Sequence, residues 1–269
     1  MNAKKILWLA TMAVIAAALV LIIGFRSGIY SDVILGGTEG VFVNSGSLKT
    51  PLEDYEDKTE NATTDEKYSD LIFPNIRIDE WQYILINYTC NIRDYTPSVA
   101  KIADGTAKLD ERIIANVNQM MMAAGEAGFD PFICGAYVSY AAQQQMMNEK
   151  ATELAAKNDI SFAEARELAK EYVESPGTSD HQTALSIDIT DKRYDGELDY
   201  SKMDKAFFDW LDAHCAEYGF IKRYPADKKT VTGRYEPWHY RYVGIQAAKF
   251  MTENNICLEE FVAHYDYQK

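Results

Sequence analysis

Two short blocks of the sequence contain side chains that could perform metal-dependent chemistry. In the first block, His181 and Asp188 lie seven positions apart. The second block contains Glu236 and His239, so the two blocks hold two of the chain's four histidines. Two imidazoles and one carboxylate can bind Zn²⁺ and leave a coordination position open for water.

This set of side chains predicts a hydrolytic site. Bound zinc lowers the pKa of a coordinated water toward ~7. A carboxylate outside the ligand set can then take the proton and pass it to a leaving amine. On this hypothesis His181, Asp188 and His239 are the ligands, and Glu236 is the base. Taken singly, each block is also compatible with ordinary surface or hydrogen-bonded histidines.

Taken together, the two blocks resemble the signature of the VanY-type D-alanyl-D-alanine carboxypeptidases, which are zinc enzymes with the hedgehog/DD-peptidase fold. That family reads S-x-H-x-x-G-x-A-x-D and, later, E-P-W-H. The corresponding positions here are Ser179, His181, Ala184, Ser186 and Asp188, followed by Glu236-Pro-Trp-His239. The resemblance extends over about residues 78–250.

The resemblance implies a role for each matching position. The zinc ligands are expected to be His181, Asp188 and His239, and the catalytic base Glu236. The expected substrate-binding residues are Ser179, Gln143, Tyr137 and Trp238. Ser179 matches a serine near the substrate's terminal carboxylate, although a turn or capping role is the alternative. Gln143 matches a glutamine in the family segment Y-R-S-Y-x-x-Q, although it could be a solvated helix residue.

The chain departs from the family at one position that matters for catalysis. The family's Y-R-S-Y reads Tyr137-Val-Ser-Tyr140 here, so Val138 replaces an arginine that is expected to stabilise charge near the scissile carbonyl. Losing such a cation can cost roughly 10²–10³ in rate. A different arginine could reach the same space, and the candidates are Arg93, Arg112 and Arg241. Alternatively, the substrate differs, or the protein binds peptides with little turnover.

A second departure concerns the backbone. Ala184 and Ser186 stand where the family motif has Gly and Ala. The methyl group of Ala184 matters if that position requires a positive φ or a close backbone approach.

The N-terminal part of the chain indicates export. Residues 6–25 are apolar apart from Thr11, which is long enough to span a bilayer. Lys4 and Lys5 precede the run and favour a cytoplasmic N-terminus. We expect a single-pass signal anchor over residues 1–25, with a cleaved signal peptide as the alternative. Either places the remaining chain outside the cytoplasm.

Composition sets further limits. An acidic segment within residues 26–77 has few large apolar side chains and predicts a disordered linker to a domain at 78–269. The net charge of −14 argues against a nucleic-acid partner. The four cysteines could form two disulfides or remain free thiols. We expect a monomer.

Helical and strand patterns alternate irregularly, which favours an α+β fold. The resemblance specifies a small central antiparallel sheet flanked by helices. Helices are predicted at 109–128, 140–157, 161–173, 204–219, 243–255 and 258–265, and strands at 83–87, 132–134 and 185–190. Ser161 and Glu164 form a capping-box pattern at the start of the third helix.

The resemblance implies a zinc-dependent carboxypeptidase that removes the terminal D-alanine from peptidoglycan stem peptides at the outer membrane face. Two alternatives stay open. One is a protein that binds these peptides with weak or no turnover, and the other is a related dipeptidase or amidase of different specificity.

Overall fold

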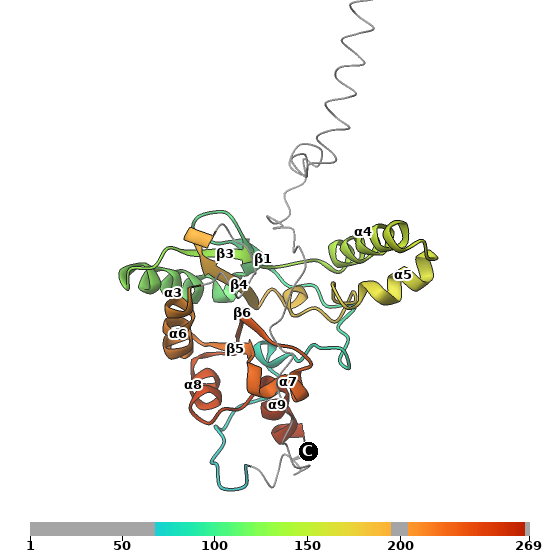
Figure 1. Cartoon of the computed structure of the whole chain (residues 1–269). Helices are drawn as coiled ribbons and strands as arrows, with labels where there is room; N and C mark the ends of the chain where they lie inside the picture. Colours follow the sequence, from blue (N-terminus) through green and yellow to red (C-terminus); the bar gives the residue numbers. More distant parts are fainter. Residues whose placement is uncertain (1–67, 195–203, 267–269) are drawn as a thin grey trace, which may run out of the picture. The chain divides into compact units, whose positions relative to one another are not determined.

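The computed structural model of the chain describes residues 68–194 and 204–266 (Figure 1). The predicted membrane segment at 6–25 and most of the predicted linker lie outside these residues. Among the residues described, no helix combines the length and the apolar character that crossing a bilayer requires.

A four-stranded sheet forms the centre of the domain. Its strand order is β3-β4-β6-β5, and every neighbouring pair is antiparallel. The strands are β3 (Pro131–Gly135), β4 (Ser186–Asp191), β5 (Phe220–Tyr224) and β6 (Glu236–Tyr242). A separate antiparallel pair joins β1 (Val99–Lys101) to β2 (Lys108–Asp110). The predicted α+β class with a small antiparallel sheet is therefore confirmed for the described residues.

Helices surround this sheet. The α-helices are α3 (Ile114–Glu126), α4 (Tyr140–Asn158), α5 (Phe162–Ala169), α6 (Lys205–His214), α7 (Lys229–Thr232), α8 (Ile245–Glu253) and α9 (Leu258–Asp266). Short 3₁₀ turns are η1 (Trp81–Tyr83), η2 (Glu111–Ile113), η3 (Asp180–Thr183), η4 (Lys192–Tyr194), η6 (Cys215–Tyr218) and η7 (Ala226–Lys228). Figure 1 shows α3, α6 and α8 along one side of the sheet.

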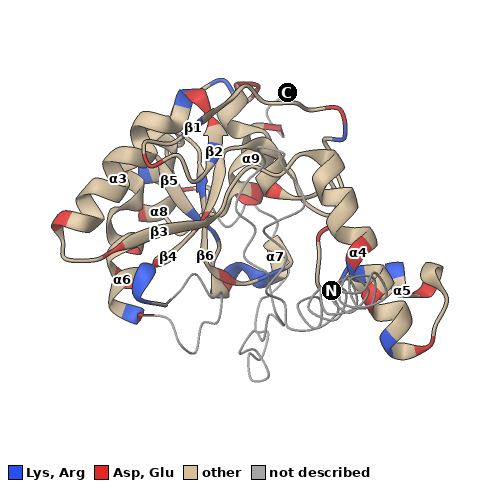
Figure 2. Ribbon diagram, turned by 90° about the horizontal axis from the view of Figure 1, so that it is seen from above, with Lys and Arg blue, Asp and Glu red and all other residues tan. Residues whose placement is uncertain are grey.

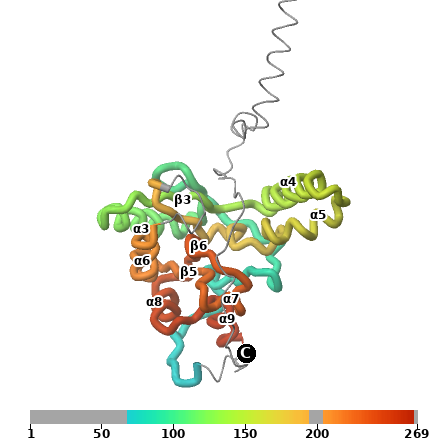
Figure 3. Tube along the Cα trace, in the orientation of Figure 1, coloured from blue at the N-terminus to red at the C-terminus, as the bar shows by residue number. Residues whose placement is uncertain are grey.

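Helices α4 and α5 form a hairpin that extends away from the sheet (Figures 1, 2 and 3). It has a small core of its own, made of Met147, Ala151, Leu154, Ala165 and Ala169. The predicted capping box is present, because Ser161 accepts from the backbone of Glu164 and the Glu164 side chain accepts from the backbone of Ser161. The hairpin can therefore hold its shape without packing its whole length on the sheet.

The main core lies between the sheet and helices α3 and α6. A second core joins α8 and α9 to the N-terminal part of the described chain. Tyr68 is buried in it, and Leu71, Phe73 and Ile76 pack against it. Residues 68–77, which the sequence assigned to the linker, therefore belong to the packed domain.

The predicted strand at 83–87 is wrong. Its backbone carbonyls are used by buried arginines rather than by a neighbouring strand: Arg241 donates to Ile84 and Arg223 donates to Ile86. Tyr83 and Ile86 are buried, which accounts for the apolar pattern that suggested a strand.

The four cysteines are free thiols, so the two-disulfide alternative is not realised.

A buried ion pair links α9 to the loop before α7. Nζ of Lys228 lies 2.9 Å from Oε2 of Glu260, and both side chains are almost fully buried. Burial alone would raise the pKa of Glu260, but hydrogen bonds from Lys228 and from the backbone N–H of Cys257 outweigh it and lower the pKa to about 2. The folded protein therefore holds Glu260 in its charged form more strongly than the unfolded chain does.

This shift predicts how stability depends on pH. Because the folded pKa lies below the unfolded value of 4.5, the Glu260 carboxylate stabilises the fold above pH 4.5, and this contribution is lost as the pH falls toward 2. We expect Glu260→Gln to be less stable at neutral pH and to show a shallower loss of unfolding free energy over that range. Urea unfolding at several pH values measures both slopes, and equal slopes would contradict this role of Glu260.

Candidate active site

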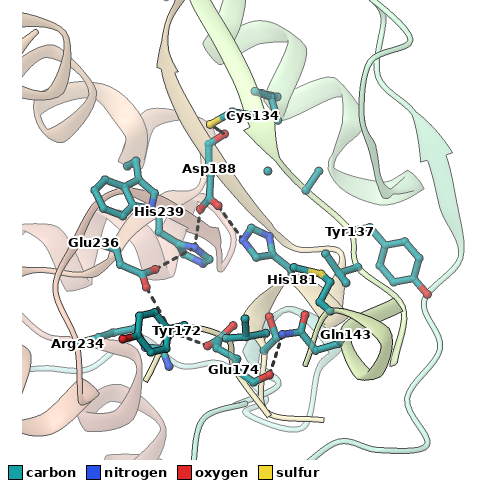
Figure 4. A pocket seen from close by; sticks show the side chains of 18 of the residues that line it. Cys134, Tyr137, Gln143, Tyr172, Glu174, His181, Asp188, Arg234, Glu236 and His239 are labelled. Atoms are coloured by element: carbon teal, nitrogen blue, oxygen red, sulfur yellow. Dashed lines mark hydrogen bonds and ion pairs between the residues drawn. The ribbon is translucent and has the colours of Figure 1, made fainter. Parts of the chain in front are cut away.

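Strand register brings two of the predicted ligands together. Asp188 on β4 lies directly opposite His239 on β6. Their side chains meet, with Oδ1 of Asp188 2.8 Å from Nδ1 of His239. His181 comes from η3, the turn that leads into β4, and its Nε2 lies 3.1 Å from Oδ2 of Asp188 (Figure 4). One ligand atom from each residue lies within 4.8 Å of the other two.

The cluster is built to hold a cation. Nδ1 of His181 is buried and makes no hydrogen bond within the described part of the chain, and the buried Oδ1 of Asp188 has its ion pair with His239. Burial alone would lower the pKa of His239, but Asp188, Asp180 and Glu236 outweigh it and raise the pKa to about 10. Two imidazoles and one carboxylate that converge in surroundings favouring positive charge fit Zn²⁺ and leave a fourth position open.

A buried carboxylate orients one of the ligands. Nε2 of His239, on the far side of the ring from Asp188, lies 3.2 Å from Oδ2 of Asp180. Asp180 is fully buried and is itself paired with Arg241 and, at 3.9 Å, with Arg223. A carboxylate at the second nitrogen fixes the ring orientation and increases the basicity of a metal-binding histidine.

A glycine allows Asp188 to reach the cluster. Gly135 on β3 is the register partner of Asp188. A Cβ atom at Gly135 would lie 2.9 Å from both Cβ and Cγ of Asp188, a separation that real atoms do not adopt. The missing side chain at position 135 therefore makes the space that the Asp188 carboxylate occupies.

Glu236 stands beside the ligands without being one of them. Its Oε2 lies 3.6 Å from Nδ1 of His239, and its Oε1 lies 3.3 Å from Nη1 of Arg234. Burial raises the pKa of Glu236, and Arg234 and His239 offset part of that rise. A raised pKa suits a group that must take a proton and then give it up near neutral pH.

A pocket of about 500 Å³ opens over this cluster. All four predicted substrate-binding residues line it: Tyr137, Gln143, Ser179 and Trp238. Ser179 precedes η3 but its side chain does not cap that turn, which removes the capping alternative. Gln143 is buried and its Nε2 donates to the carbonyl of Glu174, so it is not a solvated helix residue.

The two departures from the family motif have different structural consequences. Val138 lines the pocket with an apolar side chain. None of the three arginines considered as substitutes lines it: Arg93 stacks on Tyr140, Arg112 pairs with Asp110, and Arg241 is committed to Asp180. Ala184 adopts a φ of +59°, so this position does require the left-handed backbone that glycine adopts most easily.

Sequence reasoning missed Asp180, Gly135 and Arg234, which contact the catalytic cluster, and Glu174, which contacts it through Arg234. Asp180 and Arg234 lie inside the two recognised blocks, directly before His181 and two residues before Glu236. Their charge was the available signal, but their burial and their partners depend on the packing of strands far apart in the sequence.

We predict that Gly135→Ala weakens zinc binding, because the added methyl group displaces the Asp188 carboxylate. A loss of roughly 10-fold or more in zinc affinity is expected, measured by competition with a chromophoric chelator. Gly125→Ala is the matched control, since Gly125 lies in α3 with open space around it. Unchanged affinity in Gly135→Ala would show that Asp188 is not held as a ligand in this position.

We predict that Asp180→Asn destabilises the fold by roughly 3–5 kcal/mol, because it leaves the charge of Arg241 buried without its partner. Denaturant unfolding measures the loss. Asp191→Asn is the control: Asp191 is equally buried, but its partner Arg193 has a side chain that is 55% exposed and can be hydrated instead. Equal losses in the two variants would argue against a special role of Asp180.

Several known proteins are similar to this chain in sequence. The family model described as VanY, D-alanyl-D-alanine carboxypeptidase, matches residues 106–245. A D-alanyl-D-alanine carboxypeptidase of Enterococcus faecalis (strain ATCC 700802 / V583) is 37% identical over 185 residues, which is 68% of this chain. The match spans 66% of that relative's own length, just under two thirds.

Two solved structures are also similar. VanYB in complex with D-alanine-D-alanine superposes with a TM-score of 0.58 at 35% identity, over 68% of this chain and 98% of that one. A mutant of the vancomycin-resistance D,D-pentapeptidase VanY, in complex with Zn(II), gives a TM-score of 0.57 at 36% identity, over 68% of this chain and 99% of that one. The family model covers more than half of the sequence, and the chain therefore belongs to the VanY family of D-alanyl-D-alanine carboxypeptidases.

Proposed function

We propose that this protein is a zinc-dependent D-alanyl-D-alanine carboxypeptidase that hydrolyses the terminal D-alanine of peptidoglycan stem peptides. The observation that carries the proposal is the convergence of His181, Asp188 and His239 beside Glu236 at the base of one pocket. The similarity to VanYB, which was solved with D-alanine-D-alanine, supports this choice of substrate.

The protein's residues divide the work of peptide hydrolysis. Zinc, when bound, would supply Lewis-acid chemistry at the scissile carbonyl and would make water easier to deprotonate. His181, Asp188 and His239 would hold it, and Asp180 keeps His239 in the orientation that presents Nδ1. Glu236 accepts a proton from the attacking water and delivers it to the nitrogen of the departing D-alanine, so that the peptide C–N bond breaks.

The remaining pocket residues bind and orient the peptide. The side chain of Gln143 is fixed by its hydrogen bond to the Glu174 carbonyl, and the side chain of Ser179 does not cap η3. Both side chains can therefore present polar groups to a substrate. Trp238 lies on β6 next to His239, is buried in the main core and lines the pocket. A carboxypeptidase needs such fixed contacts because precise placement of the scissile bond lowers the activation barrier.

We further propose that the domain acts outside the cytoplasm as a monomer, anchored through residues 6–25. The support is the apolar run with two preceding lysines, which favours a single-pass signal anchor. A tethered catalytic domain at the outer membrane face would reach stem peptides in the wall.

A peptide-binding protein with weak or no turnover is the second candidate. The observation in its favour is Val138, which presents an apolar side chain to the pocket where the family has an arginine. Loss of a cation near the reacting carbonyl would reduce the rate while sparing zinc and peptide binding.

Release of D-alanine from a stem pentapeptide by the purified, zinc-loaded full-length protein tests the proposal. We expect release by the wild type and its abolition by a zinc chelator. Glu236→Ala should keep zinc and peptide binding but lower kcat by roughly 10²-fold or more, because the proton acceptor is gone.

The outcomes separate the two candidates. Peptide binding and stoichiometric zinc without any release by the wild type would favour the binding protein. Release that survives complete removal of zinc would contradict the mechanism.

A further inference from the structure

Arg234 occupies a distinctive place at the edge of the pocket. Its Nη1 lies 2.8 Å from Oε1 of Glu174 and 3.3 Å from Oε1 of Glu236. The guanidinium also lies over the ring of Tyr224, with Cζ 5.2 Å from the ring centre. Figure 4 shows Arg234 between the two carboxylates. These contacts fix a positive charge next to the general base.

The guanidinium of Arg234 has hydrogen-bond donors that its contacts with Glu174 and Glu236 leave unused. The shortest contact to each carboxylate uses Nη1, and within the described part of the chain neither Nε nor Nη2 of Arg234 donates a hydrogen bond. The side chain is 35% exposed and lines the pocket. An arginine held on one nitrogen can therefore offer the planar pair of donors that suits a carboxylate.

The reaction geometry places a carboxylate at this position. Glu236 must come within hydrogen-bonding distance of the leaving nitrogen to protonate it. In a terminal residue, the carboxylate carbon is two bonds from that nitrogen, or about 2.5 Å away. A cation in contact with Glu236 is therefore close to the free C-terminus of any peptide that Glu236 can help to cleave.

Other pocket residues do not supply this charge equally well. Lys170 is paired with the exposed Glu167, and Val138 is apolar. Lys108 and Lys229 also line the pocket, but among the described residues the ion-pair partners of Glu236 are Arg234 and His239. Ser179, which the resemblance places near the terminal carboxylate, provides a neutral hydroxyl rather than a positive charge.

We propose that Arg234 binds the C-terminal carboxylate of the substrate and so makes the site select peptides that end in a free acid. This inference rests on the proposed carboxypeptidase function and deepens it. Glu174 holds the guanidinium in place before the peptide arrives, and the free donors of Arg234 then close on the terminal carboxylate.

A pair of substrates tests the proposal. The full-length, zinc-loaded protein is given a stem pentapeptide ending in D-alanine and the same peptide ending in D-alaninamide, and the shared tetrapeptide product is quantified. The wild type should favour the free acid by about 10- to 100-fold in kcat/KM, the value of a hydrogen bond to a charged group. In Arg234→Gln this preference should fall to within about threefold of unity, because the loss falls on the free acid alone.

The ratio of the two rates cancels any effect that both substrates share, such as a displaced Glu236 or a smaller folded fraction. Arg234→Lys, which keeps the charge, should retain part of the preference, and Lys229→Gln, which removes a different pocket cation, should retain all of it. An unchanged ratio in Arg234→Gln, or a wild type that cleaves both peptides equally, would overturn the proposal while leaving the carboxypeptidase function intact. Release from neither peptide by the wild type would instead remove the proposed function, and this inference with it.

Discussion

The carboxylate of Asp180, buried against two arginines, is the interaction on which the catalytic arrangement depends. Arg223 and Arg241 have fully buried side chains, and burying a charge without a partner is strongly unfavourable. Asp180 pairs closely with Arg241, lies 3.9 Å from Arg223, and uses its other oxygen to contact His239. One carboxylate therefore links the packing of the sheet to the orientation of a metal ligand.

The same arginines tie distant segments to the sheet. Arg223 on β5 pairs with Glu259 of α9 at 2.7 Å, and Arg241 on β6 donates to the carbonyl of Ile84 at 2.7 Å. The chain before β1 thus has its carbonyls satisfied by side chains, which allows it to run as an irregular segment against the core. The two buried arginines, whose charges would be unfavourable without partners, therefore make the contacts that fix the irregular segment before β1.

Sequence patterns located the elements whose signals are local. The helices at α3, α4, α8 and α9 follow from apolar spacing, and the α5 capping box follows from Ser161 and Glu164. The strand predicted at 83–87 failed because an apolar run bounded by polar residues does not reveal what its carbonyls bind. Strands β5 and β6 were not predicted, because they carry buried arginines that disguise their strand character.

The residues of the site can also be divided into those that a local sequence motif identifies and those that it does not. His181, Asp188, Glu236 and His239 could be identified because their types and order match a motif. Gly135 and Arg234 could not, because their importance comes from what lies near them. Gly135 faces a carboxylate across a strand pair, and Arg234 contacts one carboxylate in the segment after α5 and another at the start of β6. Register and loop packing are properties of the fold and leave no trace in local spacing.

The pocket wall and the catalytic cluster are built on different supports. The ligands Asp188 and His239 sit on adjacent central strands, where register fixes their separation. Gln143 lies on the α4–α5 hairpin, which has a small core of its own, and its Nε2 donates to the Glu174 carbonyl in the segment after α5. Val138 lies two residues before that hairpin begins, and its backbone N–H donates to the carbonyl of His181, a bond that does not depend on which side chain occupies position 138. Valine in place of the family arginine therefore changes the group offered to the peptide and keeps this link to the metal ligand, while Arg234 supplies a charge at the same pocket.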